Sequence, residues 1–517
     1  MKHPCDEAVI EASARGTPCA EKSRPWVLTA TILGSSMAFI DSTAVNVALP
    51  ALQSSLHATV VDVQWVIEAY GLFLSALILV GGALGDSFGR RAMFLFGVAG
   101  FAVASAGCGF SSSIRALVLC RSIQGIAAAF LVPGSLSIIS SSFDLESRGK
   151  AIGTWAGFTT ITTALGPILG GWLIEHVSWH WVFFINVPLA AIVLVISLLH
   201  MPESRSSSAA RVDWLGAAVV TAGLAALVYG FLEPAILGWR NPRVIGTLVF
   251  GFAALVLFIL VEKTGRTPMV PLQLFQSASF SGANLLTLYL YAALGIFFFL
   301  FPLNLIQIQK YSTTATGAAA VPMILLVSFL SRWSGGLVTK YGPRLPLLVG
   351  PLIAGVGFLL FMAPDVRVHY WTAFFPAFTV LGLGMAITIA PLTTVVMNSV
   401  EPERVGIASG INNAVARVAG VLAIALLGIV MVAAFAHSLR HSLASLDLKA
   451  DVVHQLESNV SRLGDLHAPA GVDLQTAATI RAAVVQAFVF GFRVIMLLCA
   501  LLAIASAAVA WLKIPAQ

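Results

Sequence analysis

The chain has 517 residues, of which 58% are hydrophobic and only 10% are charged, and its formal net charge is +6 at pH 7. Soluble globular domains do not have this composition, so most soluble enzymes are excluded. The basic residues lie mainly in short segments between apolar stretches, where they set the orientation of a membrane protein. We therefore expect a membrane protein that does not bind nucleic acid.

Fourteen apolar stretches, each long enough to cross a bilayer, follow one another from Trp26 to Trp511. The first is too long for the apolar core of a cleaved signal peptide, so we expect it to remain as the first helix. The pattern predicts an all-α membrane protein with transmembrane helices at 26–48, 65–85, 92–110, 117–140, 151–174, 181–200, 214–232, 244–261, 281–303, 317–338, 345–363, 371–397, 408–434 and 484–512.

Lysine and arginine are distributed unevenly between the two sides of the predicted membrane. With an even number of spans both termini face one side, and that side carries about three times as many basic residues as the other. Its basic residues include Arg90, Arg91 and Arg148, whereas Arg115 and Lys310 lie on the other side. The bias predicts a multi-pass protein of the cell (inner) membrane with cytoplasmic N- and C-termini.

Two loop segments repeat one another. Gly82-Ala-Leu-Gly-Asp86-Ser-Phe-Gly89-Arg-Arg91 follows the second apolar stretch, and Gly335-Gly-Leu-Val-Thr-Lys-Tyr-Gly342-Pro-Arg344 follows the tenth in the same register. Parallel repeats of this kind are typical of transporters, which bind substrate at the interface between the two halves.

The repeat predicts four parts of the chain. These are a cytoplasmic tail at 1–25, a six-helix bundle at 26–200, a linker with two inserted helices at 201–280, and a second six-helix bundle at 281–517. The second bundle includes an extracytoplasmic loop at 435–483, where we expect a partly amphipathic helix and a break near Pro469 and Gly471.

Four motifs, in order along the chain, resemble those of a known family. They are Asp41-Ser-Thr-Ala-Val-Asn46-Val-Ala-Leu-Pro50, the loop from Gly82 to Arg91, Arg121-Ser-Ile-Gln124-Gly125, and Gly153 with Gly166-Pro167-Ile-Leu-Gly170-Gly171. Together they resemble the fourteen-helix drug:proton antiporters of the major facilitator superfamily. The chain departs from the pattern at Ser87, where the family usually has a basic residue, and at Thr339, which replaces the acidic residue in the second copy.

The resemblance implies the major facilitator fold, with two six-helix bundles and two inserted helices. It implies proton-coupled efflux of lipophilic compounds, cationic ones included, by alternating access, with the proton gradient as the energy source and no cofactor. It also identifies Gly153, Gly166, Pro167, Gly170 and Gly171 as the antiporter motif, whose proline kinks the helix and whose glycines allow close packing.

Three ionisable residues within the spans are candidates for proton coupling: Asp41, Glu68 and Arg121. A carboxylate in hydrocarbon is costly unless it is neutralised or hydrated, so it marks a transport pathway. Asp41 is the first candidate for the proton carrier, and Arg121 the residue that tunes it, although both would also fit a purely structural role. Glu68 lies nearer the predicted outer surface, where a solvated entrance is the alternative to proton transport.

The loop after the second helix supplies a candidate gate. Asp86, Arg90 and Arg91 can form ion pairs that hold the cytoplasmic side closed, with Arg148 as a neighbour. Gly82 and Gly89 belong to the same motif, and Gly89 is expected to adopt the turn conformation. The alternative is a loop that only fixes topology.

Polar and aromatic residues within the spans are the candidates for substrate binding. We expect this set to comprise Asp41, Asn46, Gln124, Tyr289, Asn412 and Asn413. Most other aromatic residues of the ninth and tenth helices are assigned to lipid contacts and core packing.

The sequence thus predicts a drug:proton antiporter with membrane lipid, small lipophilic substrates and protons as partners, functional as a monomer. An adaptor across a second membrane is left open. A proton-coupled exporter or symporter of a specific metabolite is the alternative, and a membrane-embedded lipid-modifying enzyme is a more distant one.

Overall fold

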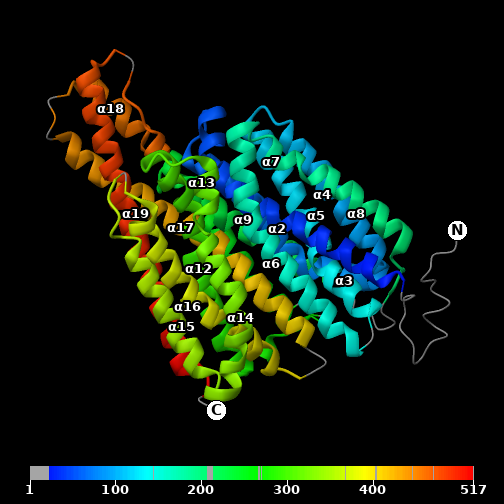
Figure 1. The fold of residues 1–517 in the computed structure, drawn as a ribbon. Helices are drawn as coiled ribbons and strands as arrows, with labels where there is room; N and C mark the ends of the chain where they lie inside the picture. The colour runs from blue at the N-terminus through cyan, green and yellow to red at the C-terminus, as the bar shows by residue number, and fades with distance from the viewer. Residues whose placement is uncertain are drawn as a thin grey trace. The chain divides into compact units, whose positions relative to one another are not determined.

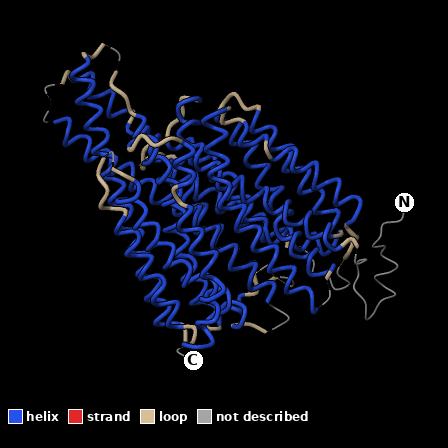
Figure 2. The backbone as a smooth tube through the Cα atoms, in the orientation of Figure 1, coloured by secondary structure: helices blue, strands red, loops and turns tan. Residues whose placement is uncertain are grey.

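The computed structural model describes residues 22–143, 145–205, 213–265, 268, 270–366, 368–401, 405–444, 446, 448–469 and 471–515. Most of the predicted tail at 1–25 therefore lies outside the described residues. Figure 2 shows helices and loops throughout the described chain, and no strand is assigned within those ranges. The all-α prediction is confirmed.

Thirteen helices of the described chain are long and apolar enough to cross a membrane, and the shorter apolar helix Arg344–Leu360 adds a fourteenth candidate. The longer helices are α2 (Arg24–Ser55), α3 (Val60–Phe88), α4 (Arg90–Gly109), α5 (Ile114–Ser142), α6 (Leu145–His176), α8 (Asn186–His200), α9 (Trp214–Leu232), α11 (Pro242–Thr264), α12 (Ala278–Leu303), α14 (Val321–Tyr341), α15 (Arg344–Leu360), α16 (Tyr370–Asn398), α17 (Val405–Ala444) and α19 (Leu474–Lys513). Short helices α7 (Trp181–Phe184), α10 (Pro234–Leu237), α13 (Thr313–Ala318) and α18 (Ala450–Ser458) and the turns η1 (Leu272–Gln276), η2 (Asn304–Ile308) and η4 (Val460–Asp465) lie between them (Figure 1).

Polar caps mark where several spans begin. The side chain of Ser113 accepts a hydrogen bond from the Ala116 amide at the start of α5, and that of Asp473 accepts one from the Thr476 amide at the start of α19. The hydrogen bonds from Thr476 hold the pKa of the exposed Asp473 carboxyl below its usual value. Each cap satisfies a backbone donor that the first turn of a helix leaves free.

The helices form two compact units. Unit 1 comprises Met1–Val45, Val66–Ala225 and Gly251–Leu272, and unit 2 comprises Asn46–Trp65, Ala226–Phe250 and Gln273–Gln517. The predicted division at residues 200 and 280 follows chain order and stays a prediction. The contacts instead assign the C-terminal end of α2 and the N-terminal end of α3 to the unit that holds α12 to α19.

Unit 1 is packed around α4 and α5, which lie against each other, and α4 also contacts α7 and α8. Glycine permits the closest approaches. A Cβ at Gly97 of α4 would lie 3.0 Å from the carbonyl oxygen of Ala127 on α5, so only glycine fits there without a shift.

Unit 2 has an aromatic core. Phe297 and Phe301 of α12 contact Phe361, which follows α15, and Phe378 of α16, with ring centroids 4.8 to 5.9 Å apart. All four rings are buried. These two aromatic residues of α12 therefore serve packing, as the sequence predicted for most of this set, because edge-to-face contacts fill the space between three helices.

Both helices that flank the predicted loop at 435–483 extend into it. Both flanking helices, α17 and α19, contain 40 residues, which corresponds to about 60 Å each and is longer than the hydrocarbon core. The stretch between them, here named the α17–α19 connection, holds α18 and η4, and buries Leu456 and Leu463. The two buried leucines belong to the stretch that the sequence predicts to be partly amphipathic, and the extracytoplasmic position of 435–483 stays a prediction.

Candidate functional site

The central feature of unit 1 is a buried ion pair between α2 and α5. An Nη1 of Arg121 lies 2.5 Å from Oδ2 of Asp41. The Asp41 side chain is fully buried and Arg121 is 1% exposed. Removing both charges from water is costly, so the pair must be held by further hydrogen bonds.

Two amides complete the surroundings of the Asp41 carboxylate. Gln124 Nε2 donates to Asp41 Oδ1 at 3.0 Å, and its Oε1 accepts from Arg121 at 2.7 Å. Asn186, at the start of α8, donates to the same Oδ1 at 3.3 Å. Gln124 and Asn186 both also donate to the hydroxyl of Ser105 on α4. Three helices, α2, α5 and α8, therefore meet at one carboxylate, and Ser105 joins α4 to the two amides.

Arg121 is oriented by contacts on its other side. Its Nε donates to the carbonyl oxygen of Val66 at 3.0 Å, and the guanidinium carbon lies 4.2 Å from the ring centroid of Tyr70. Both contacts come from α3, and a cation over an aromatic face is attracted by the ring electrons. Arg121 therefore remains held in place if Asp41 is neutralised.

The surroundings of Glu68 on α3 differ from those of Asp41. It is 0% exposed, and neither carboxylate oxygen has a hydrogen-bond partner among the described residues. The side chain is shielded from solvent in this conformation, and both the proton-transport role and the solvated-entrance alternative stay predictions. A carboxyl group without donors in an apolar interior is stable only in its neutral form.

The glycines of the antiporter motif fall into two groups. Cβ atoms at Gly166 and Gly170 of α6 would lie 3.1 Å from the Ile40 carbonyl oxygen and 2.7 Å from the Ala44 Cβ. Both neighbours lie on the stretch of α2 that carries Asp41. Gly153 has nothing within 4 Å, so the expectation of close packing is wrong there; it is exposed at the beginning of the helix. Pro167 lies between the packed positions within α6, and Gly171 is buried.

The loop between α3 and α4 contains one ion pair of the predicted gate. Arg90 lies 2.8 Å from Asp86, four residues earlier, and Arg91 Nη2 donates to the carbonyl oxygen of Leu198. Gly89 has a φ of 118°, as expected for the turn. Gly82 lies within α3, and the Arg148 side chain lies outside the described residues.

Glu203, to which the sequence assigned no role, contacts this loop through its carboxylate. Its carboxylate accepts hydrogen bonds from the backbone amides of Arg91 and Ala92 at 3.1 Å each, at the N-terminus of α4. A Cβ at Gly89 would lie within 2.9 Å of that carboxylate, so the turn has room only for glycine. Glu203 follows α8 in the sequence, and only the fold places it here.

The predicted substrate-binding residues of unit 2 have different surroundings in the structure. Asn412 donates to Thr287 Oγ1 at 2.7 Å and to Asn284 at 3.2 Å, which forms a polar cluster between α12 and α17. Asn413 is exposed and donates to the Ser409 carbonyl oxygen. Tyr289 and Asn46 are partly buried. The fold thus brings Asp41 and Gln124 together, and Asn412 joins residues that the sequence did not single out.

Hydrogen bonds also connect the C-terminal end of α2 to other parts of unit 2. Gln53 accepts a hydrogen bond from Gln307 Nε2 at 2.9 Å and donates to the Arg462 carbonyl oxygen at 3.0 Å. Arg481 Nη1 donates to the Gly464 carbonyl oxygen at 2.6 Å, and its Nη2 to that of Gln307 at 2.9 Å. The end of α2 is thereby joined to η2, to the α17–α19 connection and to α19.

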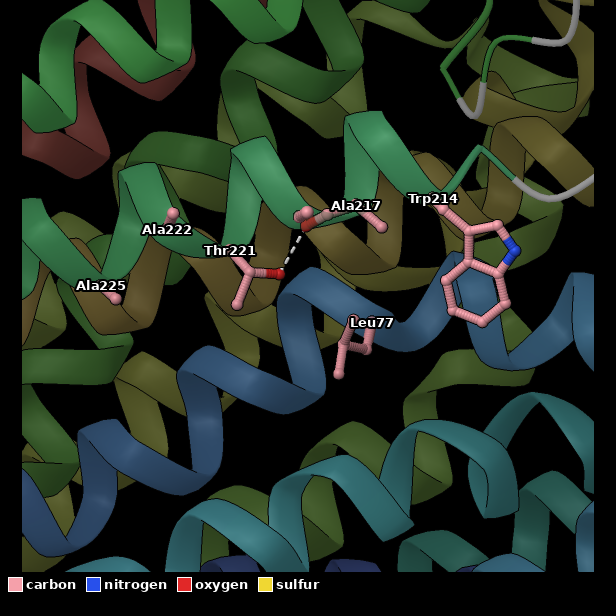
Figure 3. Close-up of a pocket in the computed structure, with 7 residues that line it drawn as sticks. Leu77, Trp214, Ala217, Thr221, Ala222 and Ala225 are labelled. Atoms are coloured by element: carbon pink, nitrogen blue, oxygen red, sulfur yellow. Dashed lines mark hydrogen bonds between the residues drawn. The ribbon is translucent and has the colours of Figure 1, made fainter.

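Unit 1 also has an apolar groove of about 410 Å³ between α3 and α9 (Figure 3). Leu77 faces it from α3, and the α9 side chains in view include Ala217, Thr221 and Ala225. The Thr221 hydroxyl donates to the Ala217 carbonyl oxygen at 2.6 Å, so the groove presents few polar atoms. It contains none of the predicted site residues.

Comparison with known proteins identifies the family. A family model described as the Major Facilitator Superfamily matches residues 31–214 and 204–424. The chain belongs to the major facilitator superfamily. It is 34% identical to the tetracenomycin C resistance and export protein of Streptomyces glaucescens, over 79% of this chain and 76% of the relative. It is 34% identical to the puromycin resistance protein pur8 of Streptomyces alboniger, over 83% of this chain and 85% of the relative.

Solved structures show the same fold. A bacterial homolog of the human lysosomal transporter Spinster, inward-facing and unoccupied, is similar with a TM-score of 0.65 and 16% identity, covering 96% of this chain and 99% of that one. A D-xylose-proton symporter has a TM-score of 0.57 and 13% identity, covering 95% and 98%. The protein is thus a multi-pass transporter of the major facilitator superfamily, in its drug-efflux group, and not an enzyme.

Sequence reasoning missed Ser105, Asn186 and Glu203. Asn186 lies in Trp179-His-Trp-Val-Phe-Phe-Ile-Asn186-Val-Pro188, a segment that none of the four motifs includes. An amide within an apolar run was a usable signal, because a buried amide needs partners. Ser105 offered no comparable signal, since a serine in a helix can bond its own backbone.

Proposed function

We propose that this major facilitator protein is a drug:proton antiporter that exports lipophilic compounds, cationic ones included, by alternating access. The observation that carries the proposal is the buried Asp41–Arg121 pair with its two amide donors, Gln124 and Asn186. The names of its drug-resistance and export relatives support efflux as the direction of transport.

Proton coupling follows from what a proton does at Asp41. Protonation removes the charge that Arg121 pairs with, while Gln124 and Asn186 are able to bond the neutral acid through their remaining groups. Arg121 is held by Val66 and Tyr70 in either case. The carboxylate can therefore lose and regain its partner without disrupting the helices around it, and each state favours a different arrangement of α2 against α5.

Glu68 provides a second protonatable group. Because it is buried without a donor, it carries a proton in this conformation and becomes ionised when water or a cationic substrate reaches it. A substrate cation that takes the place of the proton at Glu68 or Asp41 would make proton release and drug binding mutually dependent. The polar candidates Asn46, Gln124, Tyr289, Asn412 and Asn413 would contact the rest of the substrate.

The remaining predictions form part of the same proposal. The protein would function as a monomer in the inner membrane, with both termini in the cytoplasm and the proton gradient as its energy source. On this orientation the Asp86–Arg90 pair and Glu203 stabilise the cytoplasmic loop, and Gln53 and Gln307 hold the external end of α2. An adaptor would be needed only if a second membrane has to be crossed.

The test measures proton release from everted membrane vesicles when a lipophilic drug is added, for wild type and Asp41→Asn at equal expression. We expect drug-triggered release in wild type and its loss in the variant, because Asn cannot take up a proton. Asp62→Asn is the matched control: this carboxylate caps the start of α3 through the Thr59 amide, and Asn retains that acceptor.

Each other outcome has a defined meaning. Equal release in Asp41→Asn and wild type would remove Asp41 as the carrier and transfer the role to Glu68, which Glu68→Gln then tests. No release in wild type, together with drug accumulation in the vesicles, would show efflux without proton antiport and contradict the proposal.

A further inference from the structure

An acidic and aromatic cluster lies at the end of α9, away from the residues used above. It consists of Trp65 in the second turn of α3, Tyr229 of α9, and Glu233, which directly follows α9. The Glu233 amide donates to the Tyr229 carbonyl oxygen at 3.0 Å, so the two side chains lie one turn apart on the same helical face. All three residues belong to unit 2.

The Glu233 carboxylate has a neutral donor but no cationic partner. Its Oε1 accepts a hydrogen bond from the indole N–H of Trp65 at 3.3 Å. No ion pair joins it to a lysine, arginine or histidine of the described residues. The side chain is partly buried, where an uncompensated charge is less stable than in water. A cation from outside the chain would compensate it.

The two rings suit a particular kind of cation. The centroids of Trp65 and Tyr229 are 6.4 Å apart and the ring planes are inclined at 51°, so the rings do not cover each other's faces by stacking. Aromatic faces attract organic cations, and tryptophan does so most strongly. Because the cluster lies at the ends of two membrane spans, a ligand there would keep its apolar groups in the bilayer.

We propose that Trp65, Tyr229 and Glu233 form a binding site for lipophilic organic cations at the end of α9. The site rests on the proposed function as an efflux transporter, for which it names cations as a substrate class, but it does not require proton coupling. It also gives the inserted helix α9 a role in recognition, at the side of the membrane that the sequence predicts to be external.

The experiment compares binding and photolabelling in the full-length protein in lipid nanodiscs. The probes are tetraphenylphosphonium and tetraphenylborate, which have the same shape and opposite charge, and an azidophenyl phosphonium for labelling. Glu233→Gln retains the acceptor for Trp65 and removes only the charge. We expect it to weaken phosphonium binding about tenfold, with tetraphenylborate binding not weakened. Glu457→Gln is the control, because this partly exposed carboxylate is bonded to Arg440.

Mapping of the label gives the second readout. In wild type the azidophenyl phosphonium should label peptides that contain Trp65 or Tyr229, and Glu233→Gln should lose this label. Unchanged phosphonium affinity in Glu233→Gln, or a label that maps only elsewhere, would overturn the site. Proton release from everted vesicles of wild type with a neutral lipophilic drug separates the two proposals: its absence would count against antiport, not against this site.

Discussion

Arg121 comes first by residue volume among the fully buried side chains of the described residues. It forms an ion pair with the carboxylate of Asp41. Arginine does not lose its proton in proteins, so Arg121 is the fixed charge of this pair and Asp41 is the proposed proton carrier. The contacts of Arg121 with Val66 and Tyr70 keep it in place through a change of protonation. At the level of residues, a fixed cation beside a titratable acid is what proton coupling requires.

Removing Arg121 should therefore destabilise the protein more than removing the charge of Asp41. We expect Arg121→Ala to lower the free energy of unfolding by about 3–5 kcal/mol, because it leaves a buried carboxylate without a cation. Adding Asp41→Asn to Arg121→Ala should recover part of the loss. Denaturant unfolding in detergent micelles measures this, with Arg440→Ala as the control: its partner is the partly exposed Glu457, and its effect should be about 0–1 kcal/mol. Similar losses for both arginine variants would contradict this account.

The meeting of Asp41, Arg121 and Gln124 could be anticipated, because each is a polar residue in an apolar stretch and needs a partner. The contributions of Ser105 and Asn186 could not, since they depend on how α4 and α8 pack against α2. The surroundings of Glu68 could not be predicted from the sequence either. Its place near the start of a span suggested solvent contact, but burial depends on neighbouring helices that no single span reveals.

Among the helices, α6 packs directly against the stretch of α2 that carries Asp41. Gly166 and Gly170 bring its backbone against residues 40 to 44 of α2, where Asp41 lies, and Pro167 lies beside them. The glycines of the antiporter motif thus pack against the backbone of α2 beside the Asp41 carboxylate. The sequence predicted the kink and the close packing, but it did not identify α2 as the neighbour or show that Gly153 lies in open space.

A methyl group at Gly166 should separate α6 from α2. Gly166→Ala would place its Cβ against Thr43 and 3.1 Å from the Ile40 carbonyl oxygen, so the backbone must shift. We expect drug-triggered proton release to fall at least about tenfold, since displacements near 1 Å can cost 10²-fold in a tightly positioned site. Gly153→Ala is the matched control and should retain wild-type release, because nothing lies within 4 Å of its Cβ. An equal loss of proton release in both variants would show that these glycines are needed for the flexibility of α6 and not for packing against α2.

For the whole molecule, the fold class, the approximate spans and the family could be predicted because hydropathy and motif order are properties of the chain itself. The grouping of residues 46–65 with α12 to α19 could not, because it depends on contacts more than 200 residues apart, such as Gln53 with Gln307. Those contacts make the end of α2 part of unit 2. Alternating access would require them to break when the external side opens.

Holding Gln53 and Gln307 together should consequently stop transport. With the native cysteines replaced by alanine, Gln53→Cys and Gln307→Cys joined by a short bifunctional thiol reagent should abolish drug-triggered proton release, because the end of α2 can no longer separate from η2. Reduction of a cleavable linker should restore drug-triggered proton release.

The control pair is Arg440→Cys with Glu457→Cys, two side chains whose charged groups lie 3.1 Å apart on α17 and α18. Linking these should leave release intact, since the link joins α17 to α18 and does not involve α2. If the Gln53–Gln307 link leaves release unchanged while mass spectrometry shows it complete, the C-terminal end of α2 does not move during transport and the gate must lie elsewhere.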